Sequence, residues 1–465
     1  MIFSSIEFII FFGVVLLGLI LLRNRNNARK TLLLAASWYF YAYWDWRFLS
    51  LILLSTLVDF WIGRQLGSTD DSRFRKRLLV GSLAVNLGLL GFFKHFNFFI
   101  DSFRPLVEAL GLHAGTLDII LPVGISFYTF QTLSYTIDIY RGNIEPHESL
   151  LDFALFVGFF PQLVAGPIVR ASHFLPQLNE YKPLTGANFY AGFQRFTYGL
   201  FKKVFIADRL ALFSDHVFAN AGAYDCTTTW LAAIAYSLQI YFDFSGYSDM
   251  AIGVARIMGY DLGENFNFPY LSKSPREFWR RWHISLSTWV RDYIYIPLGG
   301  SWKGTLRTYF NVVLTMLLCG LWHGPAWTFV AWGGLHGVAM AGNRLFMRSG
   351  DEPANSLQAL FGWVSTMVFV VLGWVLFRSE GFGKASLMLR QMFLPEPGLN
   401  WYFPFVPFVL VGVVVVHAIK SKGYFGAWFL PHSARAYSPV FLFSLLWLSI
   451  IFQPTGFNPF IYFQF

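Results

Sequence analysis

Charged residues are scarce in this sequence of 465 residues. Only 13% of the positions are Asp, Glu, Lys or Arg, whereas a typical soluble protein has about 25%. Hydrophobic residues make up 55% and aromatic residues 20% of the chain. Because so few polar side chains cannot coat a globule of this length, the composition excludes an ordinary soluble fold. It favours a membrane protein whose surface is covered by the lipid bilayer.

Cysteine and the common catalytic motifs are scarce as well. Cys226 and Cys319 match no metal-ligand spacing, and no disulfide framework is expected. The sequence also lacks a phosphate-binding loop, a serine nucleophile elbow and a His-Glu-x-x-His metal motif. We therefore expect no metal site, and histidine remains as the residue type for chemistry within the membrane. The lack of an internal repeat weakens the case for a transporter built from inverted repeats.

The net charge of +9 could suggest a nucleic-acid partner. The basic residues, however, lie in short clusters between apolar stretches, as in 23–30 and 73–77. This pattern is typical of cytoplasmic loops under the positive-inside rule. We expect no nucleic-acid partner.

Apolar stretches long enough to span a bilayer recur along the chain, since a spanning helix needs about 20 mostly apolar residues. Residues 2–22 have no basic residue ahead of them and no small-x-small cleavage site, so they read as a span that is retained rather than a signal peptide. Residues 44–47 are predicted to form the turn of a tight helical hairpin. The sequence predicts an all-α, polytopic membrane protein of roughly 11–12 transmembrane helices with re-entrant or interfacial helices. The candidate spans are 2–22, 31–46, 48–62, 78–100, 119–137, 190–207, 230–252, 308–322, 327–347, 359–377, 401–417 and 437–452.

Basic loops predict the orientation of these spans. Loops 23–30 and 63–77 are both basic and fall on one side of the membrane, which we take as cytoplasmic. Loop 253–307 has eight Lys or Arg against four acids, so it is also predicted to be cytoplasmic. Loop 378–400 disagrees with this topology: it is predicted to lie outside, yet it carries three basic residues.

The count of crossings requires one segment between Arg141 and Arg256 that does not cross. We expect it to be 151–169, because Pro161, Gly166 and Pro167 interrupt its middle and because non-helical backbone at membrane depth must be buried by protein or reached by water. The alternatives are that 151–169 is a kinked helix that crosses, or that 190–207 lies along the cytoplasmic surface instead.

The stretch 274–297 is the richest in polar residues, and it mixes aromatic rings with cations. An amphipathic helix at the membrane surface would explain Trp279, Arg280, Arg281 and Trp282. It would not explain His283, which makes that histidine a candidate catalytic residue.

A second candidate, His323, follows an apolar run that starts near the cytoplasmic side. On a helix it lies about 24 Å beyond Arg307, at 1.5 Å per residue, deep in a bilayer core about 30 Å thick. An ionisable residue at that depth is a functional-site hypothesis by default, and Gly324-Pro325 breaks the helix beside it. The alternative is a neutral histidine bonded to a carbonyl. His336 lies about 20 Å from His323 on an unbroken helix, so we expect it to belong to another site.

Two carboxylates, Asp243 and Asp249, lie in the apolar stretch 230–252 and need partners there. Arg280 or Arg281 would serve as their ion-pair partner. We expect a structural role for this stretch, in orienting the segment that carries the arginines and tryptophans, rather than direct catalysis.

Several long motifs, in the right order, resemble the membrane-bound O-acyltransferase family, and most closely its bacterial branch that acetylates exopolysaccharides such as alginate and cellulose. The resemblance covers the chain from its start to about residue 380. The motifs are Phe3-Ser4-Ser5, Phe159-Phe160-Pro161-Gln162-Leu163-Val164-Ala165-Gly166-Pro167-Ile168, Tyr241-Phe242-Asp243-Phe244-Ser245-Gly246-Tyr247-Ser248-Asp249-Met250-Ala251-Ile252-Gly253, Glu264-Asn265-Phe266-Asn267, Phe278-Trp279-Arg280-Arg281-Trp282-His283-Ile284-Ser285 and Leu321-Trp322-His323-Gly324.

This resemblance implies specific residue roles. The family's invariant histidine falls on His323, and its second polar position falls on His283. It implies a single membrane-embedded acyltransferase domain over 1–465, with a catalytic core of about 119–347 around a central tunnel and C-terminal helices over 359–452. The expected donor-binding residues are Trp279, Arg280, Arg281 and Trp282, and the expected supporting residues are Asp243, Ser245, Asp249 and Trp322.

The resemblance further implies an acetyl transfer from a cytoplasmic thioester, acetyl-CoA or an acylated carrier, toward polysaccharide outside the cell. No permanently bound cofactor is expected. His323 would act as general base, while His283 would polarise the thioester carbonyl or hold the donor; a transient acetyl-histidine is the alternative. We expect the bacterial inner membrane as location and periplasmic acetyltransferases or polysaccharide-modifying proteins as partners. Teichoic-acid D-alanylating relatives, a flippase for a lipid-linked sugar and a non-catalytic scaffold are the rival interpretations.

Overall fold

The structure is a computed structural model that describes residues 1–113, 115–164, 166–346, 355–421, 438–453 and 460–461. Within these ranges the regular structure is helical, and one isolated β-bridge joins Tyr224 to Leu399. The prediction of an all-α protein is confirmed.

Four helical stretches in the described chain are long and apolar enough to cross a membrane: Asn26–Gly67, Ser72–Ala109, Thr305–His323 and Ser356–Arg378. Shorter apolar helices are Ile6–Leu21, Phe405–Ile419 and Pro439–Ile451. The protein is therefore a multi-pass membrane protein. The total of 11–12 crossings stays a prediction.

The chain forms two compact units, one made of Met1–Phe193 with Ala251–Gly263 and the other of Gln194–Met250 with Glu264–Phe465. The boundary falls inside two helices, α10 (Gly186–Leu200) and α12 (Cys226–Ile257). The prediction of one domain with a core over 119–347 stays a prediction.

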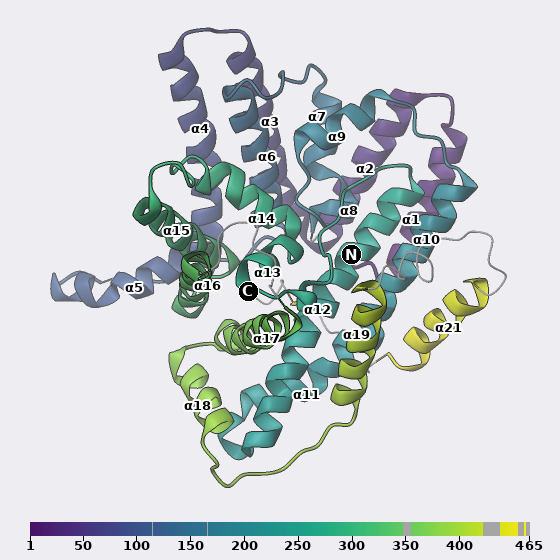
Figure 1. Cartoon of the computed structure of the whole chain (residues 1–465). Coiled ribbons are helices and arrows are strands. Elements are labelled where there is room, and N and C mark those ends of the chain that lie inside the picture. Colours follow the sequence, from purple (N-terminus) through teal and green to yellow (C-terminus); the bar gives the residue numbers. More distant parts are fainter. Residues whose placement is uncertain (114, 165, 347–354, 422–437, 454–459, 462–465) are drawn as a thin grey trace. The chain divides into compact units, whose positions relative to one another are not determined.

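The first unit is a helical bundle, in which α3, α4 and α6 lie side by side (Figure 1). The predicted turn at 44–47 is confirmed, because α2 ends at Asp45 and a short 3-10 helix, Trp46–Phe48, leads into α3. Helix α7 packs against both α2 and α3. The helices of this unit are α1 (Ile6–Leu21), α2 (Asn26–Asp45), α3 (Leu49–Gly67), α4 (Ser72–Leu90), α5 (Phe96–Ala109), α6 (Ile125–Tyr140), α7 (Leu150–Gly158), α8 (Phe160–Leu163) and α9 (Ala171–Asn179).

The predicted interruption of 151–169 is confirmed. Helix α7 ends at Gly158, Phe159 has a ψ of 111°, and α8 is a short turn of helix. Protein covers this break: Phe159 is fully buried, and the backbone N–H of Phe160 donates to Ser37 Oγ at 3.1 Å. Buried non-helical backbone of this kind meets the condition for irregular structure at membrane depth. Whether the segment crosses the membrane stays a prediction.

The predicted span 119–137 is wrong at its start. Helix α6 begins only at Ile125, because Gly124 has the left-handed φ of 78° and no helix runs through it. A Cβ at Gly124 would lie 2.5 Å from the carbonyl oxygen of Leu163, so only glycine fits this close approach.

The second unit is organised around α12 and the pair α15–α16. Its elements are the rest of α10 and α12, a π-helical segment (Phe201–Ala207), α11 (Asp208–Ala219), α13 (Pro275–Arg281), α14 (Ile284–Val290), a second π-helical segment (Arg291–Tyr295), α15 (Thr305–His323), α16 (Trp327–Phe346), α17 (Ser356–Arg378), α18 (Phe382–Phe393), α19 (Phe405–Ser421) and α21 (Ser438–Ile451).

Glycines set the distance between the helices of this unit. A Cβ at Gly199 would lie 2.4 Å from the backbone oxygen of Gly246 on α12. On the α15–α16 pair, a Cβ at Gly320 would lie 2.2 Å from Phe329 O, and one at Gly333 would lie 2.1 Å from Met316 O. Backbones this close allow extensive helix packing in a lipid environment. They also place polar side chains of facing helices within reach of one another.

The basic residues of 378–400, which disagreed with the predicted topology, are all ion-paired. Arg378 bonds to Asp215 at 2.9 Å, Lys384 to Glu380 at 2.6 Å and Arg390 to Glu396 at 2.5 Å. Each cation thus has a carboxylate partner. The positive-inside rule counts Lys and Arg whatever their partners, so the disagreement of this loop with the predicted topology stands.

Candidate functional site

His283 lies at the junction of two short helices, α13 and α14. Helix α13 begins with Ser274 as N-cap, whose hydroxyl accepts from Glu277 N, and it ends before Trp282, which is extended. His283 then adopts the left-handed φ of 44°. A non-glycine residue in this region is uncommon and costs free energy, and such residues cluster at functional sites. The side chain of His283 is fully buried.

Asn265 determines which nitrogen of His283 carries the proton. Asn265 Oδ1 lies 3.1 Å from His283 Nδ1 and also accepts from the backbone N–H of Ser285 at 3.3 Å. A backbone N–H can only donate, so the Asn265 atom that faces it must be the oxygen. His283 Nδ1 therefore donates, and the lone pair of the neutral imidazole is on Nε2. Burial lowers the pKa of His283 to about 3, so the ring is neutral near pH 7.

His323 is the last residue of α15, and it is buried. The helix stops because Gly324 is extended, and a Cβ on Gly324 would collide with the ring of Phe329. The predicted helix end beside this histidine is confirmed. The imidazole lies among aromatic rings, with centroid distances of 5.0 Å to Trp322, 5.1 Å to Trp332 and 5.4 Å to Phe377.

The two candidate histidines contact the same indole ring. The centroid of Trp322 is 6.3 Å from that of His283 and 5.0 Å from that of His323. Residues 40 positions apart in the sequence therefore meet in one buried cluster within the second unit. Phe244 on α12 packs edge-on against His283 at 4.6 Å.

His336 lies closer to His323 than the sequence suggested. The estimate assumed one unbroken helix, but the chain turns between α15 and α16 and the two helices pack together (Figure 1). Trp332 contacts both rings, at 5.1 Å from His323 and 4.8 Å from His336. The expected separation of about 20 Å is therefore wrong; that His336 belongs to another site stays a prediction. Its Nδ1 accepts from Trp279 Nε1 at 3.1 Å, so the proton of the neutral ring is on Nε2.

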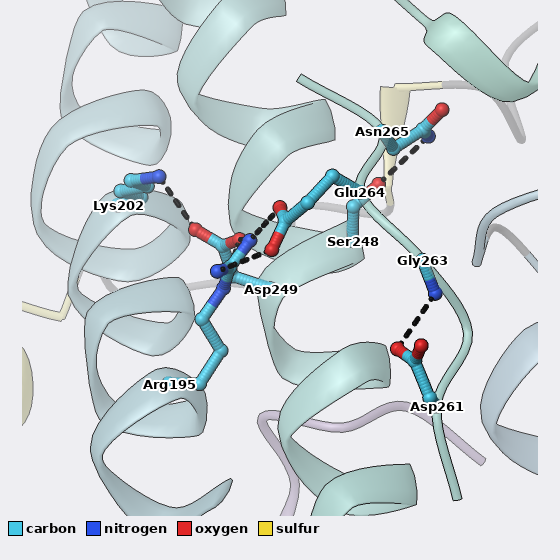
Figure 2. A network of polar contacts seen from close by, with 8 residues as sticks. All are labelled: Arg195, Lys202, Ser248, Asp249, Asp261, Gly263, Glu264 and Asn265. Atoms are coloured by element: carbon cyan, nitrogen blue, oxygen red, sulfur yellow. Dashed lines mark hydrogen bonds and ion pairs between the residues drawn. The ribbon is translucent and has the colours of Figure 1, made fainter. Parts of the chain in front are cut away.

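Asp249 has partners other than the predicted arginines. Figure 2 shows its two oxygens bonded to Arg195 at 2.6 Å and to Lys202 at 2.5 Å. Arg195 also holds Glu264 through two bonds, of 3.0 and 2.6 Å. The prediction that Arg280 or Arg281 pairs with this carboxylate is wrong. Close glycine packing brings the basic side of α10 against α12, and the sequence pattern did not reveal this contact.

Asp243 is paired in the same way, with Lys203 at 2.9 Å, and Lys203 also binds Asp208 at 2.8 Å. The backbone N–H of Ile461 donates to Asp243 at 2.9 Å. Again neither predicted arginine takes part. Ser245 is buried on the same helix. Asp243 and Ser245 are the sequence neighbours of Phe244, the residue that packs on His283.

The four predicted donor-binding residues fall into two classes. Arg280 is exposed, and Arg281 pairs with Glu277 at 2.8 Å. Trp279 and Trp282 are buried, and Trp282 packs 5.0 Å from Trp374. The arginines lie at the surface of the second unit, while the tryptophans belong to the ring cluster around the histidines.

Sequence reasoning missed several members of this cluster. Trp332, Trp374 and Asn265 received no role, although Asn265 stood in a recognised motif. Within the described ranges, no three His, Cys, Asp or Glu side chains gather as a metal-binding group.

Comparison with known proteins gives consistent results. The family model for membrane-bound O-acyltransferases matches residues 144–379. A probable alginate O-acetylase of Pseudomonas aeruginosa is 47% identical over 398 residues, which cover 84% of this chain and 75% of the relative. The peptidoglycan O-acetyltransferase of Helicobacter pylori is 36% identical over 455 residues, 91% of this chain and 82% of the relative. The teichoic acid D-alanyltransferase of Bacillus subtilis is 28% identical over 308 residues, 61% of this chain and 75% of the relative.

Proposed function

The chain belongs to the membrane-bound O-acyltransferase family and is an acyltransferase, and on that premise we propose that it moves acetyl groups from a cytoplasmic thioester to hydroxyl groups of a polysaccharide outside the cell. The proposal rests on one observation: the rings of His283 and His323 both contact Trp322. Two buried imidazoles in one cluster can divide the work of binding and proton transfer.

His323 is the proposed general base. It removes the proton of the acceptor hydroxyl as the hydroxyl oxygen attacks the carbonyl carbon of the acetyl thioester. The carbon–sulfur bond then breaks, and the proton passes to the leaving thiolate. A positioned base of this kind contributes about 10²- to 10⁴-fold to a rate.

His283 is proposed to hold the donor. Of the two roles expected from the sequence, accepting a hydrogen bond fits the neutral ring with its lone pair on Nε2 better than polarising a carbonyl, which needs a donor. Trp322 contacts both imidazoles and is proposed to keep their orientation. Asp243, Ser245 and Asp249 support this arrangement through α12.

The donor is proposed to be acetyl-CoA or an acylated carrier that approaches from the cytoplasm. Arg280 and Arg281, at the surface of the unit, would meet its anionic groups, since guanidinium groups suit phosphate recognition. Trp279 and Trp282 would form the inner wall of its path. No permanently bound cofactor or metal is part of this proposal.

The acceptor is proposed to be an exopolysaccharide, reached directly or through a periplasmic partner, and the location to be the inner membrane of a bacterium. The names of the relatives support polysaccharide as the class: alginate for one group and peptidoglycan for another. The alginate relatives have the higher identity, and the peptidoglycan relative aligns with more of the chain. The catalytic centre proposed here serves both.

Inside-out membrane vesicles with acetyl-labelled acetyl-CoA added from the exposed cytoplasmic face test this function. The wild type should transfer label to polymer or protein in the lumen. His323→Ala should lose about 100-fold or more, the lower end expected for a general base, while the protein level and its assembly stay unchanged.

The rivals give different results. A scaffold subunit would keep its labelling rate in the His323→Ala variant, and a flippase would show no acetyl transfer even as wild type. Either outcome would end the proposal.

A further inference from the structure

The segment that follows α12 runs along the junction of α13 and α14. The backbone oxygen of Asn265 accepts from Ile284 N at 2.9 Å, and Asn267 N donates to Arg281 O at 2.9 Å. These two bonds lie on either side of His283. The segment is therefore tied to the backbone that carries the histidine, and not only to its ring.

Asn265 is fully buried, and both ends of its amide are used. Oδ1 accepts from His283 Nδ1 at 3.1 Å and from Ser285 at 2.9 Å (Oγ) and 3.3 Å (N). Nδ2 donates to Ser248 Oγ at 3.1 Å. A rotation of the amide would put N–H groups against the N–H of Ser285, so the orientation of Asn265 is determined by its surroundings.

Ion pairs hold the same segment from the other side. Figure 2 shows two consecutive residues of α12, Ser248 and Asp249, beside two consecutive residues of the segment, Glu264 and Asn265. Asn265 is joined directly to Ser248 by a hydrogen bond from its side-chain amide. Glu264 and Asp249 are joined through Arg195, which binds both carboxylates. The ion pairs thus fix the position of Asn265 without touching the histidine.

We propose that Asn265 is the positioning residue of His283: it holds the imidazole in the tautomer with the proton on Nδ1, and it does so without adding charge. This inference rests on the proposed function, because it assumes that His283 takes part in acetyl transfer. In metal sites, mutation of a group that hydrogen-bonds the far nitrogen of a functional histidine typically lowers metal affinity or activity by about 10- to 100-fold.

The neutrality of Asn265 matters because charged groups that the structure describes on the elements packed near His283 already form ion pairs with one another. Phe244, Trp322 and Ser285 also lie close to its ring. Charged side chains described on these elements lie in ion pairs. They are Asp243 and Asp208 with Lys203, Asp249 with Arg195 and Lys202, Glu264 with Arg195, and Glu277 with Arg281. The titratable His323 contacts Trp322.

An aspartate at position 265 tests this proposal. Asn265→Asp keeps an oxygen toward His283 but adds a negative charge, which favours the imidazolium; a carboxylate beside a charged group typically shifts its pKa by about 1–3. Nε2 then becomes a donor. This happens below the raised pKa, which lies about 1–3 above the wild-type value of about 3. Acetyl transfer should therefore fall about 10-fold or more at about pH 4, where the wild-type imidazole is still mostly neutral, and the acidic limb of the pH–rate profile should move to higher pH by about one unit or more.

Asn265→Leu provides the second variant. It removes both the acceptor for His283 and the donor to Ser248, so the rate should fall across the whole pH range while the acidic limb stays in place. Asn220→Asp is the matched control, since this exposed residue at the end of α11 belongs to the same unit and undergoes the same change of charge. It should behave as wild type. The measurement is acetyl transfer from labelled acetyl-CoA by the full-length protein in detergent, from about pH 4 to pH 8.

The outcomes separate this inference from the proposed function. If His283→Ala abolishes transfer but Asn265→Asp shows the wild-type pH profile, the positioning role is wrong and the proposed function stands. A gain of activity in Asn265→Asp would also overturn it, because a protonated His283 would then be polarising the carbonyl. A fully active His283→Ala variant would overturn both. Size-exclusion profiles check that each variant is folded. If Asn265→Leu is misfolded, the result for Asn265→Asp alone tests the positioning role.

Discussion

Neighbouring histidines in this protein have different hydrogen-bond arrangements, which suit them to different tasks. His336 accepts from Trp279 at Nδ1, and this bond orients the ring as part of the wall behind His323. His336→Asn keeps an acceptor near the position of Nδ1, so we expect at least half of the wild-type acetyl transfer. His323→Asn should lose about 100-fold or more. Transfer of labelled acetyl groups in vesicles checks both. Loss of transfer in His336→Ala together with more than a tenth retained in His323→Ala would reverse the assignment.

The buried charge of Lys203 is expected to contribute strongly to the stability of the protein. Its ammonium lies between Asp208 and Asp243, and removal would leave two buried carboxylates without their cation. Breaking a buried ion pair from one side costs about 3–5 kcal/mol. We expect Lys203→Ala to lower the stability of the detergent-solubilised protein by an amount of that order, as measured by thermal unfolding.

Lys384→Ala is the control for this prediction, because its pair with Glu380 is exposed and such pairs contribute about 0–1 kcal/mol. If both variants lose the same amount of stability, burial does not explain the contribution of the Lys203 ion pairs to the free energy of unfolding.

At the scale of elements, the contact of α15 with α16 determines where His323 and Trp332 lie. Gly333→Ala would place a methyl group 2.1 Å from Met316 O, and backbone cannot move aside as a side chain can. The helices must separate, which typically costs about 1–3 kcal/mol, and acetyl transfer should fall together with stability. Thermal unfolding and the vesicle assay measure the two effects.

Gly342→Ala lies on the same helix and has nothing within 4 Å of the added methyl group. It should leave both quantities unchanged or raise stability slightly, since alanine is the better helix former. A Gly333→Ala protein as stable as Gly342→Ala would contradict the close packing described here.

The sequence predicted most of these elements because their signals are local. The turn at Asp45, the break near Pro161 and the end of α15 at Gly324 follow from proline, glycine and the lengths of apolar runs. The errors came from contacts between distant segments. The pairing of Asp249 with Arg195 depends on glycine packing between α10 and α12, and the place of His336 depends on a turn that a helical count from His323 ignores.

At the scale of the whole molecule, the predicted topology can be tested at Ser301. This residue is exposed in loop 253–307, whose eight basic residues predict a cytoplasmic location. A Ser301→Cys protein should react with an impermeant thiol reagent only in inside-out vesicles or lysed cells. Labelling from the periplasm of intact cells would contradict the topology and the cytoplasmic route of the donor. The natural Cys226 and Cys319 require a cysteine-free background.

The contact between Asp243 and Ile461 has a consequence for biosynthesis. The two residues are 218 positions apart, and chains are made from the N-terminus onward. Lys203 precedes Asp243, so this carboxylate can enter the bilayer already paired with its cation. Phe460, however, packs on Phe244, which packs on His283, and these contacts form only after nearly the whole chain has been translated. The nascent protein can thus acquire its helices early, while the packing behind His283 is completed among the last steps of maturation.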